Sequence, residues 1–126
     1  MTGDRDDPGG SDGADGVSTP AEGTVDRENG LVVNERQTEK GLLVSVCDGD
    51  LIGRTFEEGE VSLTVSEEFY GGETLTDEET VESLSRASVA NLVGVRAVEL
   101  AVEAGYVEEA NVLDVGDTRH AQFMRL

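Results

Sequence analysis

Apolar residues are scarce before Gly30 and frequent after it, and this break limits which part of the chain can fold. Residues 1–30 contain seven of the sixteen glycines and both prolines, and no Leu, Ile or aromatic residue. Eight acidic residues against two arginines give the segment a net charge of −6. Such a segment buries too little apolar surface to offset the entropy lost on ordering. We therefore predict a disordered acidic tail over 1–30 and one small domain over 31–126.

A translation start near Leu31 or Val33 would explain the first segment equally well. That segment has neither the basic start nor the apolar run of a signal peptide. No part of the sequence approaches the roughly 20 apolar residues of a membrane-spanning helix. Cys47 is the only cysteine, so no internal disulfide can form. These features predict a cytoplasmic protein that does not contact membranes.

The predicted domain is strongly acidic, which bears on both its solvent and its partner. Residues 31–126 carry 20 acidic and 7 basic residues, a net charge of −13, and Lys40 is the only lysine. A folded domain of this charge repels itself unless salt screens it, and the Debye length is about 3 Å at 1 M salt. The composition favours a salt-rich cytosol over the binding of a basic ligand. No Lys/Arg cluster in the sequence indicates contact with DNA.

Three short segments in the first half of the domain predict strands. Residues 42–47 (LLVSVC) are an apolar run of strand length, and Asp48-Gly49 is typical of a two-residue hairpin turn. Residues 51–56 (LIGRTF) are then expected to return beside the first strand. Residues 61–65 (VSLTV) alternate strictly between apolar and polar side chains. The pattern predicts an antiparallel meander of three strands.

Two helices are predicted to follow. Thr76 and Glu79 have the spacing of a capping box, which predicts a helix from Thr76 to about Ala87. A longer helix is predicted over 88–104, with Gly105 as its C-terminal cap. Apolar residues surround most of this second helix, so we expect it to be the most buried element.

Two last strands are predicted at 111–115 and 120–126, joined through Gly116-Asp117. The element order is then β-β-β-α-α-β-β. It predicts an α+β fold in which two helices pack on one face of a mainly antiparallel sheet.

The stretch that connects the meander to the first helix contains two of the five aromatic residues, Phe69 and Tyr70, followed by Gly71 and Gly72. The glycines allow a sharp turn, so that one ring covers the apolar face of the meander. Alternatively, Tyr70 is exposed and available for stacking or hydrogen bonding. The two interpretations agree if Phe69 points inward and Tyr70 outward. Phe69, Tyr70 and Gly72 are therefore candidate contact residues.

Arg54 and Asn91 are the other two candidate contact residues. Arg54 either forms an ion pair with Glu57 or Glu58, or lines a shallow site for an anionic or planar ligand together with Tyr70. Asn91 lies in the first turns of the predicted second helix. The nearby Gly94 indicates close packing against the sheet, or a frayed helix start whose free amides bind an anion.

Four segments, taken together in their order and spacing, resemble a known family. They are Cys47-Asp48, Leu51-Ile52-Gly53-Arg54, Phe69-Tyr70-Gly71-Gly72 and Asn91-Leu92-Val93-Gly94. From about Leu31 to Leu126 the chain resembles the archaeal family known as domain of unknown function 424, in its haloarchaeal form. The resemblance implies a small cytoplasmic archaeal protein without an assigned activity, and it supplies no catalytic residues. The archaeal setting suggests a link to translation or RNA handling.

The reactive side chains are few, and this favours binding over catalysis. Cys47 ends an apolar run, which is typical of an inert core thiol, and the only histidine, His120, begins a predicted strand. No spacing of ligands indicates a metal site or a cofactor. We predict a non-enzymatic binding module for a protein or ribonucleoprotein partner, contacted through helix 88–104 or the aromatic stretch. The helix could also serve a dimer, and the sequence leaves the oligomeric state open. The alternative is a small enzyme or ligand-binding domain that uses Cys47, Arg54 or His120.

Overall fold

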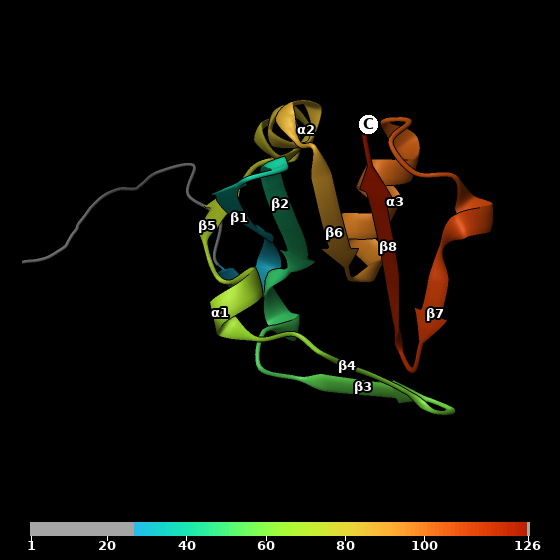
Figure 1. Cartoon of the computed structure of the whole chain (residues 1–126). Helices are drawn as coiled ribbons and strands as arrows, with labels where there is room; N and C mark the ends of the chain where they lie inside the picture. Colours follow the sequence, from blue (N-terminus) through green and yellow to red (C-terminus); the bar gives the residue numbers. More distant parts are fainter. Residues whose placement is uncertain (1–26, 126) are drawn as a thin grey trace, which may run out of the picture.

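A six-stranded sheet organises residues 27–125, which are the residues that the computed structural model describes (Figure 1). In order across the sheet the strands are β5 (Glu73–Leu75), β1 (Leu31–Thr38), β2 (Gly41–Asp48), β6 (Val89–Val93), β8 (Thr118–Met124) and β7 (Leu113–Val115). Four of the five neighbouring pairs are antiparallel, and only β2 and β6 run parallel. The predicted α+β fold with a mainly antiparallel sheet is confirmed.

Strand β1 was not predicted, although it forms a hairpin with all eight residues of β2. Only its first three residues are apolar and buried, and residues 34–38 are polar and largely exposed. A turn of two residues, Glu39-Lys40, joins the strands between Thr38 and Gly41. The polar half of β1 therefore resembled a loop in the sequence, while its pairing with β2 makes it a strand.

The predicted three-stranded meander is wrong in its first pairing, although its last two strands do pair with each other. A short 3-10 helix, η2 (Gly49–Leu51), follows β2 in place of a hairpin turn. The chain then forms a separate two-stranded hairpin from β3 (Thr55–Glu58) and β4 (Val61–Thr64). Strand β3 cannot return beside β2, because β6 occupies the edge of β2 that β1 leaves open.

The stretch predicted to be a connection contains two elements, the one-turn helix α1 (Glu67–Tyr70) and strand β5. Ser66 begins α1, since its side chain accepts a hydrogen bond from the Phe69 amide at 3.2 Å. The next helix, α2 (Asp77–Arg86), begins at the predicted capping box. The Thr76 and Glu79 side chains each accept the other's backbone N–H. The prediction of this helix is confirmed.

The predicted long helix over 88–104 is wrong in its first half. Residues 89–93 form strand β6, and the helix α3 comprises only Val95–Glu103. Gly94 separates the two with φ +118°, a backbone conformation that other residues rarely adopt. Gly105, with φ +87°, follows the end of α3 as predicted.

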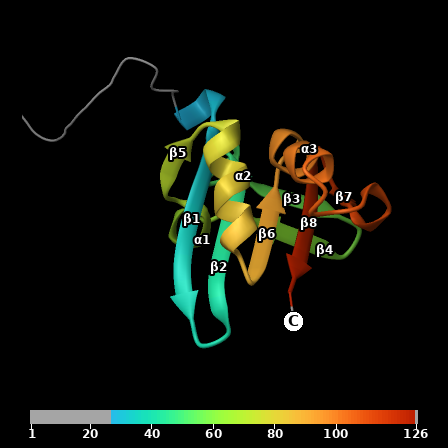
Figure 2. The ribbon, with the colours of Figure 1, turned by 90° about the horizontal axis from the view of Figure 1, so that it is seen from above.

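Helices α2 and α3 cover one face of the sheet, as predicted, and enclose the larger core (Figure 2). Strand residues that point to this face include Leu31 and Val33 from β1, Val44 and Val46 from β2, and Ala90 and Leu92 from β6. A second core lies under the opposite face, where the β3–β4 hairpin and α1 cover one end of the sheet (Figure 1). Its buried members are Val32, Cys47, Leu51, Phe56, Val65, Tyr70, Val93 and Val115.

The ends of the folded unit differ slightly from the predicted ones. A short 3-10 helix, η3 (Glu109–Asn111), precedes β7, which is shorter than predicted, and β8 begins two residues before His120. At the N-terminal end, η1 (Arg27–Asn29) and the buried Gly30 belong to the folded unit, since the Gly30 carbonyl accepts the Gly49 amide at 2.9 Å. Residues 1–26 of the predicted tail lie outside the described residues. Within 27–125, no helix has the length and apolar character needed to cross a membrane.

Candidate interaction surface

Arg54 and Tyr70 differ in exposure, so the predicted site does not present both side chains. Tyr70 is only 4% exposed, and burial raises the pKa of its hydroxyl to about 12. Arg54 is exposed, and within residues 27–125 its guanidinium stacks over the Phe56 ring, 4.8 Å from the centroid, without an ion pair to Glu57 or Glu58. Tyr70 is therefore a core residue, and Arg54 has no exposed phenol beside it.

Phe69 lies between the core and the surface. It is half-buried, and its ring meets the Tyr70 ring edge to face with centroids 5.0 Å apart. The Arg36 guanidinium lies 5.8 Å from the Phe69 centroid and donates a hydrogen bond to the Glu68 carbonyl. The inward ring is thus Tyr70, and Phe69 is the more exposed of the two. This is the reverse of the predicted arrangement, in which Phe69 points inward and Tyr70 outward.

Gly72 and Asn91 have different roles. A Cβ on Gly72 would lie 2.1 Å from the Val33 carbonyl oxygen, so glycine allows β5 to approach β1. Asn91 is in the middle of strand β6 and not in a helix. The amides that begin α3 are already used, because the Asp48 carboxylate accepts the Arg96 amide at 3.2 Å and the Ala97 amide at 2.9 Å. The predicted anion site at a frayed helix start is therefore wrong.

Cys47 and His120 lie on the same face of the sheet but on opposite sides of Val93. Two strand spacings, about 9.6 Å, separate their backbones, too far for a thiol–imidazole hydrogen bond. Burial raises the pKa of the Cys47 thiol to about 12, and burial lowers the pKa of His120. At neutral pH both groups are uncharged, and Cys47 lacks the thiolate that a nucleophile requires.

Uncharged polar side chains form a row across four adjacent strands on the face that α2 and α3 leave free. The pairing of the strands places Asn34 beside Ser45, Ser45 beside Asn91, and Asn91 beside Gln122. This row lies next to the buried row of Val32, Cys47 and Val93. Asn34 is engaged, since its side-chain amide donates to the Gly71 carbonyl at 2.5 Å. Of the other three side chains, Gln122 is exposed, Asn91 is half-buried and Ser45 is buried, at 1% exposure.

An apolar row lies beside this polar row, towards the end of the sheet where β6 begins. It consists of Leu43, Val89 and Met124, with Arg36 at its β1 side. Met124 is 64% exposed, and Leu43 and Val89 are half-buried. We call the six central residues of the two rows the open face: Leu43, Ser45, Val89, Asn91, Gln122 and Met124.

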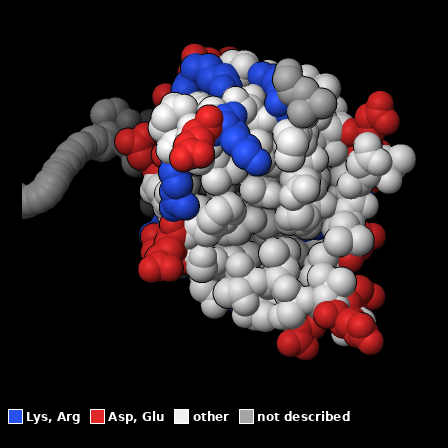
Figure 3. Space-filling model, viewed as in Figure 1, with Lys and Arg blue, Asp and Glu red and all other residues white. Residues whose placement is uncertain are grey.

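The open face contains no charged residue, although the chain carries 28 acidic residues. Figure 3 shows this side of the molecule with uncharged atoms across its middle, basic residues with acidic ones among them towards the top, and acidic residues at the left, right and lower right edges. The overall composition is strongly acidic, so it does not explain why this area lacks charge. A distinct uncharged area on a protein surface is typical of a contact site. The open face is therefore the best candidate for a contact surface.

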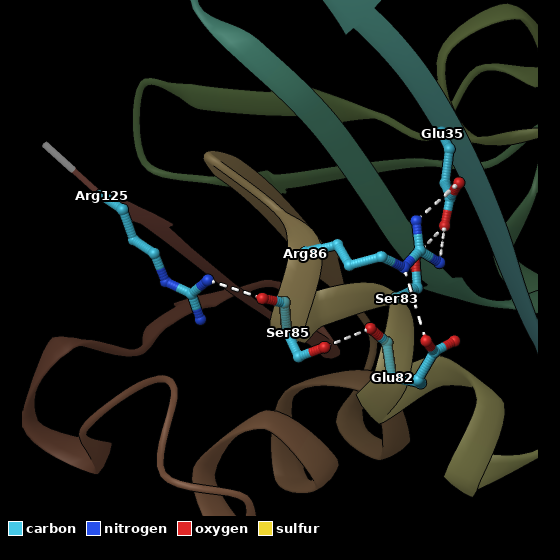
Figure 4. A network of polar contacts seen from close by, with 6 residues as sticks. All are labelled: Glu35, Glu82, Ser83, Ser85, Arg86 and Arg125. Carbon is cyan, nitrogen blue, oxygen red and sulfur yellow. Dashed lines mark hydrogen bonds and ion pairs between the residues drawn. The ribbon is translucent and has the colours of Figure 1, made fainter.

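Basic residues gather at the end of the sheet beside the apolar row. Four of the eight basic residues in 27–125 are found there: Arg36, Lys40, Arg86 and Arg125. Figure 4 shows that two of them are held by the protein. Arg86 pairs with Glu35 at 2.8 Å and with Glu82 at 3.6 Å, and Arg125 donates to the Ser85 carbonyl at 2.8 Å. Arg36 and Lys40 are exposed near the open face, and Arg36 also donates to the Glu68 carbonyl at 3.1 Å.

A cavity of about 540 Å³ lies between α2 and the β5–β1 edge, and Gly72 is among its lining residues. Its polar groups are largely engaged with one another. Glu35 accepts hydrogen bonds from Arg86 and Ser83, and Glu79 accepts the Thr76 amide. Among residues 27–125, no three His, Cys, Asp or Glu side chains are arranged to hold a metal ion. The cavity is therefore a weaker candidate than the open face.

Sequence reasoning selected Asn91 but missed Ser45 and Gln122, its neighbours in the polar row. The signal was present, because each strand contains an uncharged polar residue between two apolar neighbours: Ser45 in LLVSVC, Asn91 in VANLV and Gln122 in HAQFM. Their alignment depends on strand order, which the sequence did not reveal.

Comparison with known proteins agrees with the fold. A crystal structure of an uncharacterized conserved protein from Methanopyrus kandleri is similar, with a TM-score of 0.63 and 24% sequence identity over 74% of this chain and 89% of that chain. At this identity the similarity concerns the fold alone. A search of curated proteins finds no significant match. The profile of the family described as "Protein of unknown function (DUF424)" matches residues 35–126, most of the chain, and the protein therefore belongs to this family.

Proposed function

We propose that the protein is a non-enzymatic binding module whose contact surface is the open face. The observation that supports this most is that the six neighbouring residues of the open face carry no charge, and that Gln122 and Met124 among them are exposed, in a domain with a net charge of −13. The cores of protein interfaces are depleted in charged residues and enriched in Met. The partner is a protein, alone or within a ribonucleoprotein.

The chemistry of the surface fits a protein better than bare RNA. The open face offers an apolar row for packing and a polar row for hydrogen bonds, while single-stranded RNA is usually held on aromatic side chains. Among the described residues, Phe69 is the one partly exposed aromatic ring near this surface, and it is half-buried. The acidic edges would also repel phosphates.

Affinity purification from a high-salt lysate of the source organism tests this function. The bait is compared with Gln122→Glu/Met124→Glu, which places two charges on the open face. The matched control is Gln37→Glu/Val95→Glu, which likewise replaces one glutamine and one apolar residue with glutamate, at exposed positions outside the open face. We expect the control to recover the same partner as the wild type, and the open-face variant to lose it about ten-fold or more.

Nuclease treatment separates the two kinds of partner. Recovery that survives nuclease indicates a direct protein partner, and recovery lost with nuclease indicates a ribonucleoprotein. Equal recovery by the wild type and the open-face variant would contradict the proposed contact surface.

A further inference from the structure

We infer that the partner seated on the open face is a second copy of this chain, inverted so that the two copies are related by a two-fold axis. This inference rests on the proposed function, because it uses the same contact surface and names its occupant. A two-fold interface requires a surface that is complementary to itself.

The two ends of this surface carry opposite charge. At the end where β6 begins, Arg36 on β1 and Lys40 in the β1–β2 turn are exposed, with Glu39 as the acidic residue of the same turn. At the other end the β3–β4 hairpin presents Glu57, Glu58 and Glu60. Figure 3 shows the basic residues, with acidic ones among them, towards the top and acidic residues at the lower right edge, on the same side of the molecule.

The acidic hairpin lies at the opposite end of the sheet from the cations. Glu58 accepts the Gly116 amide at 3.1 Å, which fixes the hairpin beside the β7–β8 turn. That turn precedes Thr118, at the start of β8, while Met124 ends β8 beside the start of β6. The uncharged open face therefore lies between a basic end and an acidic end.

A two-fold rotation that turns the second copy end for end places each basic end against an acidic end. It also places the two open faces together. Any arrangement that aligns the two copies in parallel would instead place like charges together, which disfavours it. The exposed apolar side chains are spread along this surface, with Met124 at the basic end and Val61, 47% exposed, next to the acidic tip. The self-complementary charge is what favours a second copy over an unrelated partner.

Charge exchange between copies tests the arrangement. The basic-end variant is Arg36→Glu/Lys40→Glu, and the acidic-end variant is Glu57→Lys/Glu60→Lys, which keeps the Glu58 hydrogen bond. In a dimer of either variant alone, like charges face each other at both contacts. We therefore expect the dimer dissociation constant to rise by about ten-fold or more. An equimolar mixture of the two restores opposite charges at both contacts, and we expect it to form a heterodimer.

The measurement is sedimentation equilibrium of the full chain at KCl concentrations from about 0.15 M to 1 M, because salt weakens the long-range repulsion between two acidic copies more than the contact between adjacent charges. The control is Arg27→Glu/Arg96→Glu, which has the net charge of the basic-end variant but alters other edges, and it should remain dimeric. Gln122→Glu/Met124→Glu, which places two charges on the exposed part of the open face, should be monomeric. Circular dichroism verifies that each variant is folded.

A monomeric wild type at every concentration would overturn the inference, as would a dimer that persists in both charge variants. A mixture that stays monomeric would also overturn it. In any of these cases, loss of a lysate partner by Gln122→Glu/Met124→Glu would still support the proposed binding function. The two proposals are therefore tested separately.

Discussion

The carboxylate of Asp48 occupies the space that a side chain at position 94 would need. A Cβ on Gly94 would lie 2.3 Å from the Asp48 Cγ. From this position the carboxylate accepts the Arg96 and Ala97 amides and caps helix α3 from a different strand. Two segments that carry the family resemblance, Cys47-Asp48 and Asn91–Gly94, thus contact each other at the start of helix α3.

Replacing Asp48 with Ala should destabilise the protein by about 1–2 kcal/mol, because the amides that begin α3 lose their acceptor. Asp48→Asn should cost less, since its side-chain oxygen can still accept the Ala97 amide. Burial raises the pKa of Asp48, opposed by these amide hydrogen bonds, so losing the charge is not itself costly. Urea unfolding of the wild type and the two variants gives their free energies of unfolding. Equal destabilisation by Ala and Asn would contradict the capping role of Asp48.

Gly94→Ala should destabilise the protein more than Gly105→Ala. Both glycines have positive φ, so both substitutions strain the backbone, but a Cβ on Gly105 has no atom within 4 Å. The difference between the variants isolates the clash with Asp48, and we expect about 1–3 kcal/mol. Thermal unfolding of both variants provides the comparison. A Gly94→Ala protein as stable as Gly105→Ala would show that the carboxylate moves aside freely.

Cys47 should react with thiol reagents only when the protein unfolds. Its side chain is fully buried, and burial holds its thiol pKa near 12. The labelling rate at neutral pH should therefore rise in parallel with urea unfolding. Cys47→Ala/Ser62→Cys is the control, because position 62 is exposed and its thiol should react at once in the folded protein. Rapid labelling of native Cys47 would reopen the enzyme alternative.

Glu35 should make the stability depend on pH in the acidic range. Hydrogen bonds from Arg86 and then from Ser83 lower its pKa below the ordinary value of 4.5. A carboxylate with a lowered pKa contributes stability above its unfolded-state pKa, and loses it as the pH falls through its folded-state value. We therefore expect Glu35→Gln to lower stability near neutral pH, and the difference from the wild type to shrink below about pH 4.5. Urea unfolding across this range measures it.

A second variant tests the same ion pair from its other side. Arg86→Gln should reduce the pH dependence in the same way, because Glu35 then lacks the donor that lowers its pKa most. A difference from the wild type that stays constant down to low pH would contradict the role of this pair.

Salt should stabilise the folded state. Raising KCl from about 0.15 M to 1 M shortens the Debye length from about 8 to 3 Å and weakens the self-repulsion of the acidic surface. The melting temperature should therefore rise with KCl. Glu57→Lys/Glu60→Lys carries less negative charge and should gain less. A melting temperature that does not respond to KCl would remove the basis for predicting a salt-rich cytosol.

Helix α2 was predictable because residues close together in the sequence determine where it begins. Thr76 and Glu79 bond to each other's backbone within a single turn, so no distant part of the chain decides the outcome. Gly105 was predictable for the same reason. Residues 89–93 were not, because an apolar segment of that length suits a helix as well as a strand. Its pairing with β2 on one side and β8 on the other, both far away in the sequence, makes it a strand.

The candidate surface was predictable only in part, for a related reason. Phe69 and Tyr70 were selected because aromatic residues are rare in this chain. Which ring points inward depends on Ser66, because Ser66 begins the one-turn helix α1 that sets the direction of both rings. Asn91 was selected from its neighbour Gly94, and its actual companions are Ser45 and Gln122 on other strands. A surface built by strand order cannot be read from any single segment.

The parallel pairing of β2 with β6 also sets when this protein can fold during its synthesis. Strand β2 ends at Asp48 and its neighbour β6 ends at Val93, and β8 comes later still. At about 5–20 residues per second, the ribosome needs about 2–9 s to add the intervening residues. Until β6 is made, β2 has an unpaired edge, and α2, which packs on the β1–β2 hairpin, is complete only at Arg86. For most of that interval the edge is therefore open to pairing with other chains.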